Sequence, residues 1–374
     1  PSHDTVLEIP VPGELAVIDR LKYGKLLIEG AEESGADLHY DTVVQDVTQA
    51  DDGTVTGVTG IHKGDPVAYD AEIVIDGAGA LSLLQDKVDF EGTTFDTNVQ
   101  YSQFCSAYRE IVEVEDEVEW DDALVFKPTK RAAGYLWYFP RTSTTINAGL
   151  GFQMNEEPMQ MVDDLKEDLK DREEFDGAEV TDKLGAALPT RRVYDSAVAP
   201  GYMAVGDAAA HVNPTTGGGI AGAAYAGQYA AEQAVEAIES GDVSEDTLWH
   251  YNERVMDHFG AKYAALDVYN ILSTAVDIDD LMGLLAALPG EKLAEALYTG
   301  KTSMGPLLAA RTAIDSFGYW RQILDFYRVK QLAEKLINHY QRYPSTPAAL
   351  ETWQRQRDEL METIYETTGA EPKY

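Results

Sequence analysis

Apolar and polar residues alternate along the first two thirds of the chain in patterns that predict both helices and strands. Asp19 stands where an N-cap residue would begin a helix over residues 21–34. Asp52-Gly53 and residues 63–65 are turn sequences that join runs of alternating Val, Thr and Ile. The strands predicted from these and similar runs cover residues 37–49, 54–62, 67–76, 99–114, 123–126, 135–139, 146–152 and 202–205.

Helical patterns occupy much of the rest of the chain. Residues 156–175 predict a strongly charged, solvent-facing helix, and a helix rich in Ala and Gly is expected to end at Ile238. The C-terminal third shows the pattern of amphipathic helices, interrupted at Pro289-Gly290 and at residues 345–347. The order of these elements predicts an α/β protein with a mixed core, an inserted sheet layer and a helical C-terminal region.

The composition of the 374-residue chain suits two or three folded domains. Hydrophobic residues make up 44% and aromatic residues 10%, which is typical of a folded protein. Lys and Arg number 29 against 65 Asp and Glu, a formal net charge of −36 that leaves no basic surface for nucleic acid. Because salt at about 1 M shortens the Debye length to roughly 3 Å, this charge indicates a halophile's acidic surface.

A single cysteine, Cys105, excludes a disulfide scaffold and a cysteine-rich metal or iron–sulfur site, and it fits a reducing cytoplasm. Lys and His show no metal-like clustering, so we predict no metal. The longest stretch without Asp, Glu, Lys or Arg, residues 208–231, is mostly Ala and Gly and is too weakly apolar for a membrane span. We therefore expect a cytoplasmic protein without a transmembrane helix.

Two glycine patterns match a dinucleotide-binding fingerprint in form. The first, Gly77-x-Gly79, follows a strand of buried type, but Ser82 stands where a third glycine is required. The segment after it is not clearly helical. A tight turn after a core strand and a cofactor contact are equally good interpretations of this pattern.

The second pattern, Gly217-x-Gly219-x-x-Gly222, opens a helix but is separated from its strand by residues 206–216. A Rossmann turn has no room for such an insertion, so we do not read this pattern as an NAD fingerprint. Consecutive glycines nevertheless present backbone N–H groups at a helix N-terminus, which favours an anionic ligand. Gly222 is instead expected to allow close packing of the helix.

Residues 206–220, Gly-Asp-Ala-Ala-Ala-His-Val-Asn-Pro-Thr-Thr-Gly-Gly-Gly-Ile, carry a more specific signal. Asp207, at the end of a strand, is suited to accept a hydrogen bond from a ribityl or ribose hydroxyl. The segment resembles the second flavin-binding motif of the p-hydroxybenzoate hydroxylase-like FAD enzymes. More narrowly, it is similar to the geranylgeranyl reductase family, which includes the archaeal digeranylgeranylglycerophospholipid reductases.

The resemblance extends over residues 17–238 and implies which residues bind FAD. Ile18-Asp19-Arg20 resembles the family segment whose Arg approaches the FAD pyrophosphate. Val44 falls where family members contact the adenosine side through the backbone. The cofactor-binding residues implied by the resemblance are Arg20, Val44, Gly206, Asp207, Pro214, Gly217, Gly218, Gly219 and Ile220.

A further match lies in the strand over residues 135–139, where Tyr-x-Trp-x-Phe-Pro is followed eight residues later by Gly-x-Gly. Tyr135, Trp137 and Phe139 share one face of a strand, which is suited to line an apolar channel for an isoprenoid chain. An ordinary half-buried strand with cross-strand aromatic pairs is the alternative. The residues that the resemblance assigns to the substrate are Tyr135, Trp137, Phe139, Pro140, Gly149 and Gly151.

The implied architecture is a FAD-binding doubly wound domain with an inserted antiparallel-sheet substrate domain and a helical C-terminal region. Family members begin with a βαβ unit that carries Gly-x-Gly-x-x-Gly, whereas residues 1–18 contain only Gly13, so we expect an N-terminally truncated FAD-binding domain. The predicted domains are 1–95 and 191–245 for FAD, 96–190 for the substrate-binding sheet and 246–374 for the helical region.

Several residues outside these motifs have two interpretations. His211 is suited to act as an acid or to satisfy backbone groups of its loop, and we favour the second. Cys105 is expected to be a buried small apolar residue. Arg191-Arg192 is suited to bind a phosphate head group or a reduced nicotinamide cofactor, but a surface ion pair is the better interpretation in so acidic a protein.

The family resemblance implies a FAD-dependent oxidoreductase that saturates C=C bonds of geranylgeranyl chains in archaeal membrane lipid precursors, with NAD(P)H or ferredoxin as reductant. Its implied partners are an isoprenoid lipid, the inner face of the membrane as a peripheral contact, and an electron-donor protein. A flavin-dependent monooxygenase or halogenase on the same fold is the alternative, because halogenases carry a similar aromatic pattern; the Gly-x-Gly spacing favours the reductase. A catalytically incomplete lipid-binding fragment is the second alternative.

Overall fold

The computed structural model describes residues 16–129, 134–154, 158–276 and 320–374 of the chain. These residues fall into two compact units, and each unit has its own hydrophobic core. Within the described ranges, the first unit holds residues 16–42 and 105–187, and the second holds residues 43–104 and 188–374. The four-part domain division predicted from the sequence stays a prediction.

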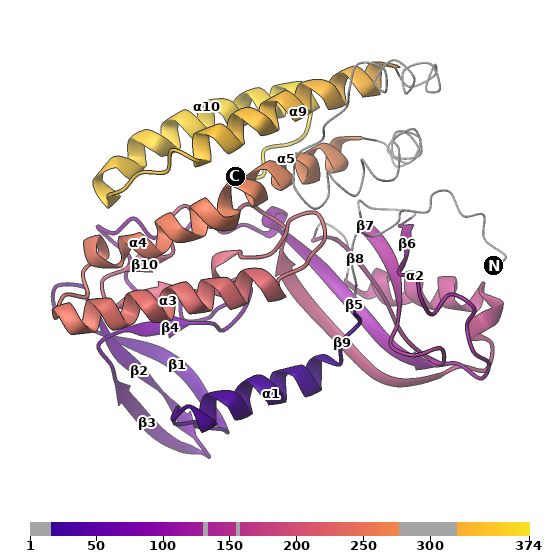
Figure 1. Ribbon diagram of the computed structural model, residues 1–374, viewed down its shortest axis with the longest axis horizontal. Helices are drawn as coiled ribbons and strands as arrows, with labels where there is room; N and C mark the ends of the chain where they lie inside the picture. The colour runs from indigo at the N-terminus through magenta and orange to yellow at the C-terminus, as the bar shows by residue number, and fades with distance from the viewer. Residues whose placement is uncertain (1–15, 130–133, 155–157, 277–319) are drawn as a thin grey trace. The chain divides into compact units, whose positions relative to one another are not determined.

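The first unit is built on a five-stranded sheet with the order β6-β7-β8-β5-β9. The hairpin partners β6 and β7, and β7 and β8, pair antiparallel, as do β5 and β8 (Figure 1). The predicted strands of this unit are present, but 123–126 is shifted to Val125–Pro128, and 99–114 opens with a 3-10 turn at Tyr101–Gln103. The strands are β5 (Phe104–Glu113), β6 (Val125–Pro128), β7 (Gly134–Pro140), β8 (Thr145–Gln153) and β9 (Glu179–Pro189).

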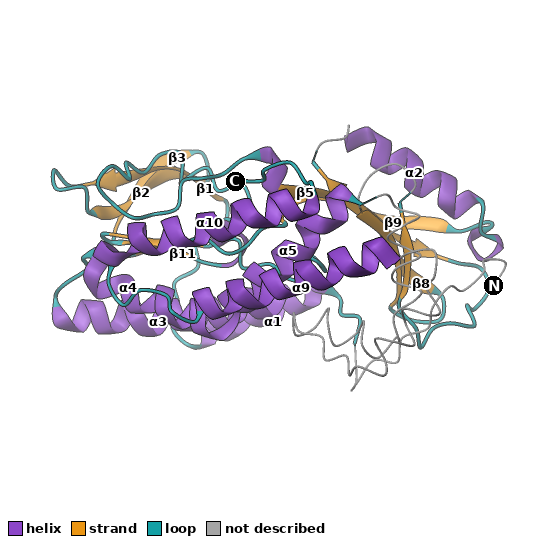
Figure 2. Ribbon diagram, turned by 90° about the horizontal axis from the view of Figure 1, so that it is seen from above, coloured by secondary structure: helices purple, strands orange, loops and turns teal. Residues whose placement is uncertain are grey.

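Two α-helices are present in the described part of the first unit. Helix α1 (Arg20–Glu33) begins as predicted at Asp19, whose carboxylate accepts hydrogen bonds from the N–H groups of Leu21 and Lys22 at 3.0 and 3.1 Å. Helix α2 (Pro158–Lys170) lies along the sheet (Figure 2). The prediction that this helix faces solvent holds for one face only, because Asp163, Lys166 and Glu167 are exposed while Met161 and Leu165 are buried in the core beneath the helix. The many charged residues of α2 made its amphipathic pattern hard to recognise in the sequence.

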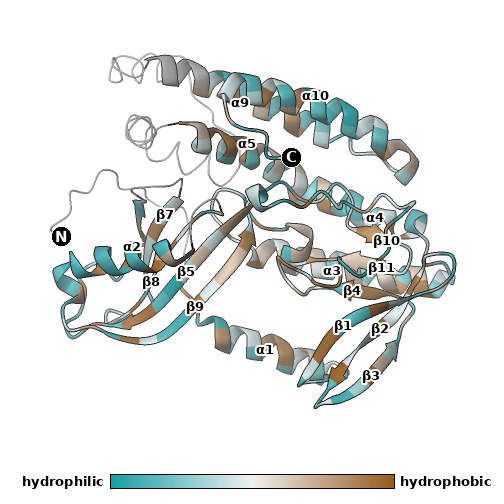
Figure 3. Cartoon of the chain, turned by 180° about the vertical axis from the view of Figure 1, so that it is seen from behind, coloured by the Kyte–Doolittle hydropathy of each residue, from teal (hydrophilic) through white to brown (hydrophobic). Residues whose placement is uncertain are grey.

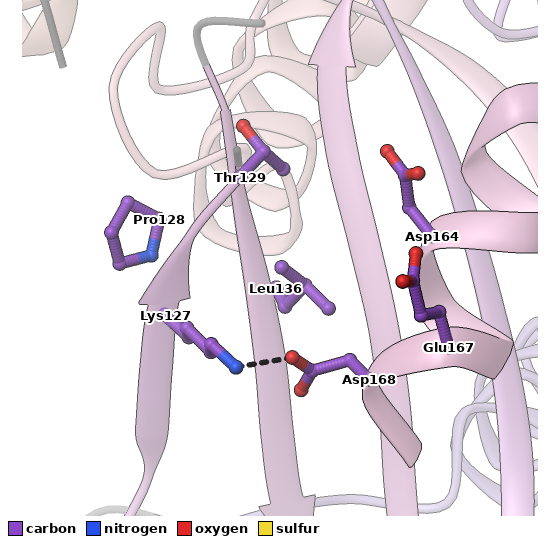
Figure 4. A pocket seen from close by; sticks show the side chains of 7 residues that line it. All are labelled: Lys127, Pro128, Thr129, Leu136, Asp164, Glu167 and Asp168. Carbon is purple, nitrogen blue, oxygen red and sulfur yellow. Dashed lines mark hydrogen bonds and ion pairs between the residues drawn. The ribbon is translucent and has the colours of Figure 1, made fainter. Parts of the chain in front are cut away.

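A buried carboxylate joins α2 to the sheet. Asp168 forms an ion pair with Lys127 of β6 and accepts a hydrogen bond from the hydroxyl of Tyr138 in β7. The ion pair borders a cavity of about 30 Å³, which Figure 4 shows with Leu136 on its wall. Burial and the Asp168 charge raise the pKa of Tyr138, so its hydroxyl stays protonated and remains a donor.

We expect Tyr138→Phe to lower the free energy of unfolding by about 1–2 kcal/mol, because Asp168 loses one of its hydrogen bonds in a buried setting. Denaturant unfolding measures this difference. Tyr101→Phe is the matched control, because that side chain is 76% exposed and its hydroxyl should contribute within about 0.5 kcal/mol. Equal losses in the two variants would show that the Asp168 contact contributes nothing.

The second unit contains two three-stranded sheets. One has the order β1-β2-β3, and the other has the order β10-β11-β4, in which β11 and β4 run parallel. The predicted strand over 67–76 is wrong as a single element, because it divides at residues 71–73 into β3 and β4 of different sheets. The strands are β1 (Thr42–Gln49), β2 (Val55–His62), β3 (Asp65–Asp70), β4 (Val74–Asp76), β10 (Val198–Ala199) and β11 (Tyr202–Ala204).

The described part of the second unit also contains helices, of which α9 packs against both α5 and α10 (Figure 1). A π-helical turn, Met256–Gly260, joins α4 to α5 without a break in helical backbone angles. Figure 3 shows hydrophilic and hydrophobic residues mixed along α10, as expected for an amphipathic helix. The helices are α3 (Ile220–Ser240), α4 (Glu245–Val255), α5 (Ala261–Ala275), α9 (Trp320–Tyr340) and α10 (Leu350–Thr368).

The predicted break at 345–347 is confirmed between α9 and α10, and the break at Pro289-Gly290 lies outside the described residues. No helix in the described part of the chain combines the length and the apolar composition that crossing a bilayer requires.

Candidate functional site

The segment over residues 206–220, which we call the glycine loop, links β11 to α3 in the second unit. Two of its glycines have backbone angles that other residues rarely adopt, with φ of +62° at Gly206 and +68° at Gly217. The same backbone region is occupied by Ala210, at φ +57°, which ends a short 3-10 turn. The shape of the loop therefore depends on glycine at defined positions.

His211 fixes the start of the glycine loop. Its Nδ1 atom accepts a hydrogen bond from the N–H of Gly206 at 3.1 Å, and its ring packs against the ring of Phe259, with 5.3 Å between centroids. The side chain is buried, and burial lowers the pKa of His211 to about 3. The prediction that this histidine satisfies loop backbone groups is confirmed, because its neutral imidazole acts as an acceptor.

This histidine makes the stability of the fold sensitive to acid. The unfolded chain, with an ordinary histidine pKa of 6.5, takes up a proton that the folded chain takes up only near pH 3, so stability falls as the pH drops below about 6.5. We expect His211→Asn, which keeps an acceptor and cannot be protonated, to lose about 2 kcal/mol less than the wild type between pH 7 and pH 5. Denaturant unfolding in molar salt at both pH values tests this; identical losses contradict it.

Asn213 organises the middle of the glycine loop. Its side-chain oxygen accepts hydrogen bonds from the backbone N–H and the hydroxyl of Thr215 at 3.0 and 2.9 Å. Its backbone accepts from the N–H of Gly217 at 2.9 Å and donates to the carbonyl of Gly218 at 3.0 Å. Pro214 is buried, whereas Thr216, Gly217 and Gly218 are exposed. The loop thus presents a rigid backbone ridge to solvent.

Within that ridge, the donors available to a ligand are fewer than the sequence suggested. The N–H of Gly217 is already bonded to Asn213, and that of Gly218 donates to the Thr216 hydroxyl at 3.3 Å. Gly219 is the N-cap of α3 and has no side chain that caps the helix. The backbone N–H groups of Gly219 and the first turn of α3 are therefore the ones suited to an anionic ligand or a carbonyl oxygen.

The remaining predicted cofactor residues lie in both units. Asp207 lies close to Gly219: a methyl group on Gly219 would be 3.2 Å from the Asp207 Oδ1 atom. Ile220, at the first position of α3, is 39% exposed. Val44 is in β1 of the second unit and is 38% exposed, and Arg20 is the first residue of α1 in the first unit. The contact of these residues with a cofactor stays a prediction.

Gly222 has a packing role, as predicted. A methyl group at this position would lie 2.2 Å from the backbone oxygen of His211, so only glycine lets α3 approach the glycine loop this closely. Ala226 and Ala230, one and two turns further along α3, are fully buried in the core of the unit. Small residues on this face of α3 hold the helix against the loop.

The other glycine pattern, Gly77-x-Gly79, is organised by the residue before it. The buried Asp76 carboxylate accepts hydrogen bonds from the Ala78 N–H at 2.9 Å, the Ser82 hydroxyl at 2.5 Å and the Tyr202 hydroxyl at 2.6 Å. Ser82, which breaks the fingerprint in the sequence, is part of this arrangement. These contacts account for a tight turn without any ligand.

The predicted substrate strand, β7, separates its side chains as its alternation requires. Leu136 and Tyr138 are buried against α2, while Tyr135, Trp137 and Phe139 lie half-buried on the opposite face. Phe126 of β6 pairs with Trp137 in register, and its ring lies 5.2 Å from Phe139 and 5.5 Å from Tyr135. We call Phe126, Tyr135, Trp137 and Phe139 the aromatic face.

Phe126 was missed as a site residue, although it is 56% exposed beside the other three rings. The short strand that carries it was predicted, so its pairing with β7 was the signal available in the sequence. Burial raises the pKa of Tyr135 to about 12, and the neighbouring Cys105 thiol adds to the rise. Cys105 itself is half-buried rather than buried as expected.

The two glycines of β8 face different side chains, and their contact with a substrate stays a prediction. Gly149 lies directly under Trp137, because a methyl group there would be 2.3 Å from the indole ring. The indole N–H donates to the Asn147 side chain at 3.2 Å, which fixes the ring over β8. Gly151 faces the Cys105 sulfur, 3.2 Å from a methyl group placed there. Trp137 therefore fills the space beside Gly149. Pro140, at the end of β7, is a buried residue.

The prediction of a surface ion pair at Arg191-Arg192 is wrong. Arg191 is 1% exposed and pairs with Asp96 at 2.8 Å, and it also donates to the Gln103 side chain at 2.8 Å. Arg192 is 3% exposed, with its guanidinium 3.4 Å from the centre of the Tyr374 ring. The prediction rested on the acidic composition, whereas the carboxylate that pairs with Arg191 lies 95 residues away in the sequence.

Comparison with known proteins gives a consistent set of relatives. Residues 17–269 match the family model of tryptophan halogenase. A digeranylgeranylglycerophospholipid reductase of Sulfolobus acidocaldarius is 26% identical over 358 residues, which cover 94% of this chain and 79% of the relative. One of Methanopyrus kandleri is 30% identical over 325 residues, which cover 79% of this chain and 78% of the relative.

Across eight relatives of that name, the chain spans 57% to 79% of the relatives' own lengths. Among solved structures, a geranylgeranyl bacteriochlorophyll reductase-like protein of Thermoplasma acidophilum aligns with a TM-score of 0.67 at 23% identity. The alignment covers 84% of this chain and 74% of that protein, and it shows a shared fold.

Proposed function

Since this chain belongs to the geranylgeranyl reductase family, we propose that it saturates the C=C bonds of geranylgeranyl chains in archaeal ether-lipid precursors. The family assignment confirms the resemblance found in the sequence, the α/β fold of p-hydroxybenzoate hydroxylase type and the class of FAD-dependent oxidoreductase. The observation that carries the proposal is the aromatic face, which offers an extended apolar surface in a chain that also has the glycine loop.

The glycine loop fits FAD on its own geometry. An isoalloxazine ring accumulates negative charge when it is reduced, and the N–H groups of Gly219 and the first turn of α3 would stabilise that charge if the ring were bound beside them. When bound, reduced FAD supplies a hydride for the alkene. The ridge of Thr216, Gly217 and Gly218 is exposed and rigid, so it can hold a flat ring edge without reorganising.

The aromatic face is suited to the hydrocarbon part of the substrate. Isolated alkenes accept hydride poorly, so the chain must be held in one position and water must be kept out. Trp137 is fixed by Asn147 and by the sheet beneath it, and it stacks with Phe139 at 6.1 Å between centroids. These rings offer a rigid apolar surface with little conformational entropy to lose on binding.

We extend the proposal to the partners of the reaction. An isoprenoid lipid brings the protein to the inner face of the membrane as a peripheral contact, and an acidic surface requires high salt for that approach. The reductant is NAD(P)H or ferredoxin. NAD(P)H carries negatively charged phosphates, so its approach to a chain with a net charge of −36 should become faster as the salt concentration rises, as should the approach of an acidic electron-donor protein.

The test is an anaerobic incubation of the protein with dithionite-reduced FAD and a geranylgeranyl ether lipid. We expect the lipid mass to rise by about two units for each double bond, since each reduction adds a hydride and a proton. The same lipid with saturated chains is the control. Unchanged lipid, in a protein that binds FAD, would refute the reductase function.

The match to the tryptophan halogenase model supports one competing function, a flavin-dependent halogenase or monooxygenase. Such an enzyme needs O₂, so the same incubation in air with chloride or bromide separates the two. Products that form only with O₂ or halide would favour this alternative over the reductase.

A further inference from the structure

A buried lysine near the end of the chain contacts the helix that holds the glycine loop. Lys373 is 6% exposed, and its ammonium donates to the Asp267 carboxylate at 2.8 Å, to the Asn270 side-chain oxygen at 2.7 Å and to the carbonyl of Thr190. Asp267 is 1% exposed and also accepts a hydrogen bond from the Tyr374 hydroxyl. The lysine and the aspartate are thus a buried ion pair that binds the segment after α10 to α5.

Asn270 connects the buried ion pair of Lys373 and Asp267 to the glycine loop. It lies one turn after Asp267 on α5, and its side-chain NH₂ donates to the carbonyl of Pro214 at 3.2 Å. An ammonium group can only donate, so Lys373 forces the amide oxygen of Asn270 to face it. The NH₂ group then has to face Pro214, and a flipped amide would place two oxygens against each other.

Pro214 lies in the part of the glycine loop where a hydrogen bond from α5, which we call the tether, can hold the loop in position. It follows Asn213, whose hydrogen bonds set the positions of Thr215 and Gly217, and it precedes the exposed ridge of the loop. The hydrogen bonds within the loop fix its shape, whereas the bond from Asn270 fixes where the loop lies relative to α5.

We propose that Lys373 and Asn270 are positioning residues for the glycine loop: the lysine orients the amide, and the amide holds the loop in place for FAD. The inference rests on the proposed function for its ligand, while the tether itself is a property of this chain's residues. Neither side chain touches the cofactor in this proposal, so both act through the Pro214 carbonyl.

The test compares Asn270→Leu and Lys373→Met with Arg357→Met. Arg357 is a buried cation of α10 paired with Asp195, so its loss destabilises the same helical region without touching the glycine loop. The readouts are hydrogen exchange of a peptide covering residues 212–219, the FAD dissociation constant and the absorbance spectrum of bound flavin. Exchange of the loop peptide can be measured in the absence of FAD.

For Asn270→Leu we expect loop exchange about fivefold faster and FAD binding about fivefold weaker than in the wild type, as the loss of one net hydrogen bond predicts. Lys373→Met should show the same loop effect with a lower melting temperature, because Asp267 is left buried without its cation. Arg357→Met should lower the melting temperature and leave loop exchange at its wild-type rate.

Loop exchange and FAD affinity that stay at wild-type values in Asn270→Leu would overturn the proposal, as would equal loop exchange in all three variants. If the wild type binds no FAD, the proposed function fails, while the exchange comparison still decides whether the tether exists.

Discussion

Replacing Gly222 with alanine is expected to weaken FAD binding by at least about tenfold and to lower the free energy of unfolding by about 2 kcal/mol or more. The added methyl group would lie 2.2 Å from the backbone oxygen of His211 and 3.4 Å from its Cβ atom. A backbone atom cannot turn aside as a flexible side chain can. Either α3 or the glycine loop must shift, and both carry the N–H groups suited to the flavin. Flavin fluorescence titration and denaturant unfolding measure the two effects.

Gly227 provides a matched control on the same helix. It lies five residues further along α3, and no atom lies within 4 Å of a methyl group placed there. Gly227→Ala is expected to raise stability by up to about 1 kcal/mol, because alanine favours the helix, and to leave FAD affinity unchanged. If both variants lost flavin equally, helix composition and not the contact with His211 would be responsible.

The second large effect is expected at the aromatic face, where Gly149→Ala should lower kcat/KM for the lipid at least about tenfold and cost about 2 kcal/mol or more in stability. A methyl group at Gly149 would lie 2.3 and 2.5 Å from two indole carbons of Trp137 and 2.7 Å from the backbone oxygen of Tyr108. The indole must leave the sheet and lose its hydrogen bond to Asn147. Mass-resolved turnover of the lipid and thermal unfolding measure the outcome.

Gly151, two residues along the same strand, provides the control. A substitution there shows whether the effect at Gly149 comes from the contact with Trp137 or from replacing any glycine of β8. A methyl group there would meet the Cys105 sulfur at 3.2 Å and every other atom at 3.5 Å or more. Gly151→Ala should therefore change stability and turnover only slightly. A loss of stability without a loss of turnover in Gly149→Ala would support the alternative that the aromatic strand is only a packing element.

The sequence predicted the elements whose signals are local. Asp19 caps α1 with its own side chain, and the turns at residues 52–53 and 63–64 have glycines at φ +85° and +97°, so each signal is contained within a few residues. Strand β9 was missed because the first eight of its eleven residues are exposed, so it shows no apolar alternation. The division of 67–76 was missed because two strands of different sheets lie only three residues apart.

The sequence predicted the motifs of the candidate site but not the contacts that hold these motifs in place. The glycine loop and three of the four aromatic residues follow patterns that can be read directly from the sequence. The contacts that hold them come from distant positions: Asn270 reaches Pro214, and Asp96 pairs with Arg191. Long-range pairs of this kind leave no local pattern, so a buried arginine and a surface arginine look alike in one sequence.

The π-helical turn Met256–Gly260 sets the rotational phase of α5. Such a turn holds one residue more than an α-helical turn, and one residue corresponds to about 100° of rotation. The number of residues upstream therefore determines that Asp267 faces Lys373 and that Asn270 faces the Pro214 carbonyl, and no substitution within α5 could restore those directions once that number changed. Deletion of the exposed Asp257 would turn the whole face of α5 away from Pro214, so the length of this helix is under a stricter constraint than the identity of its surface residues.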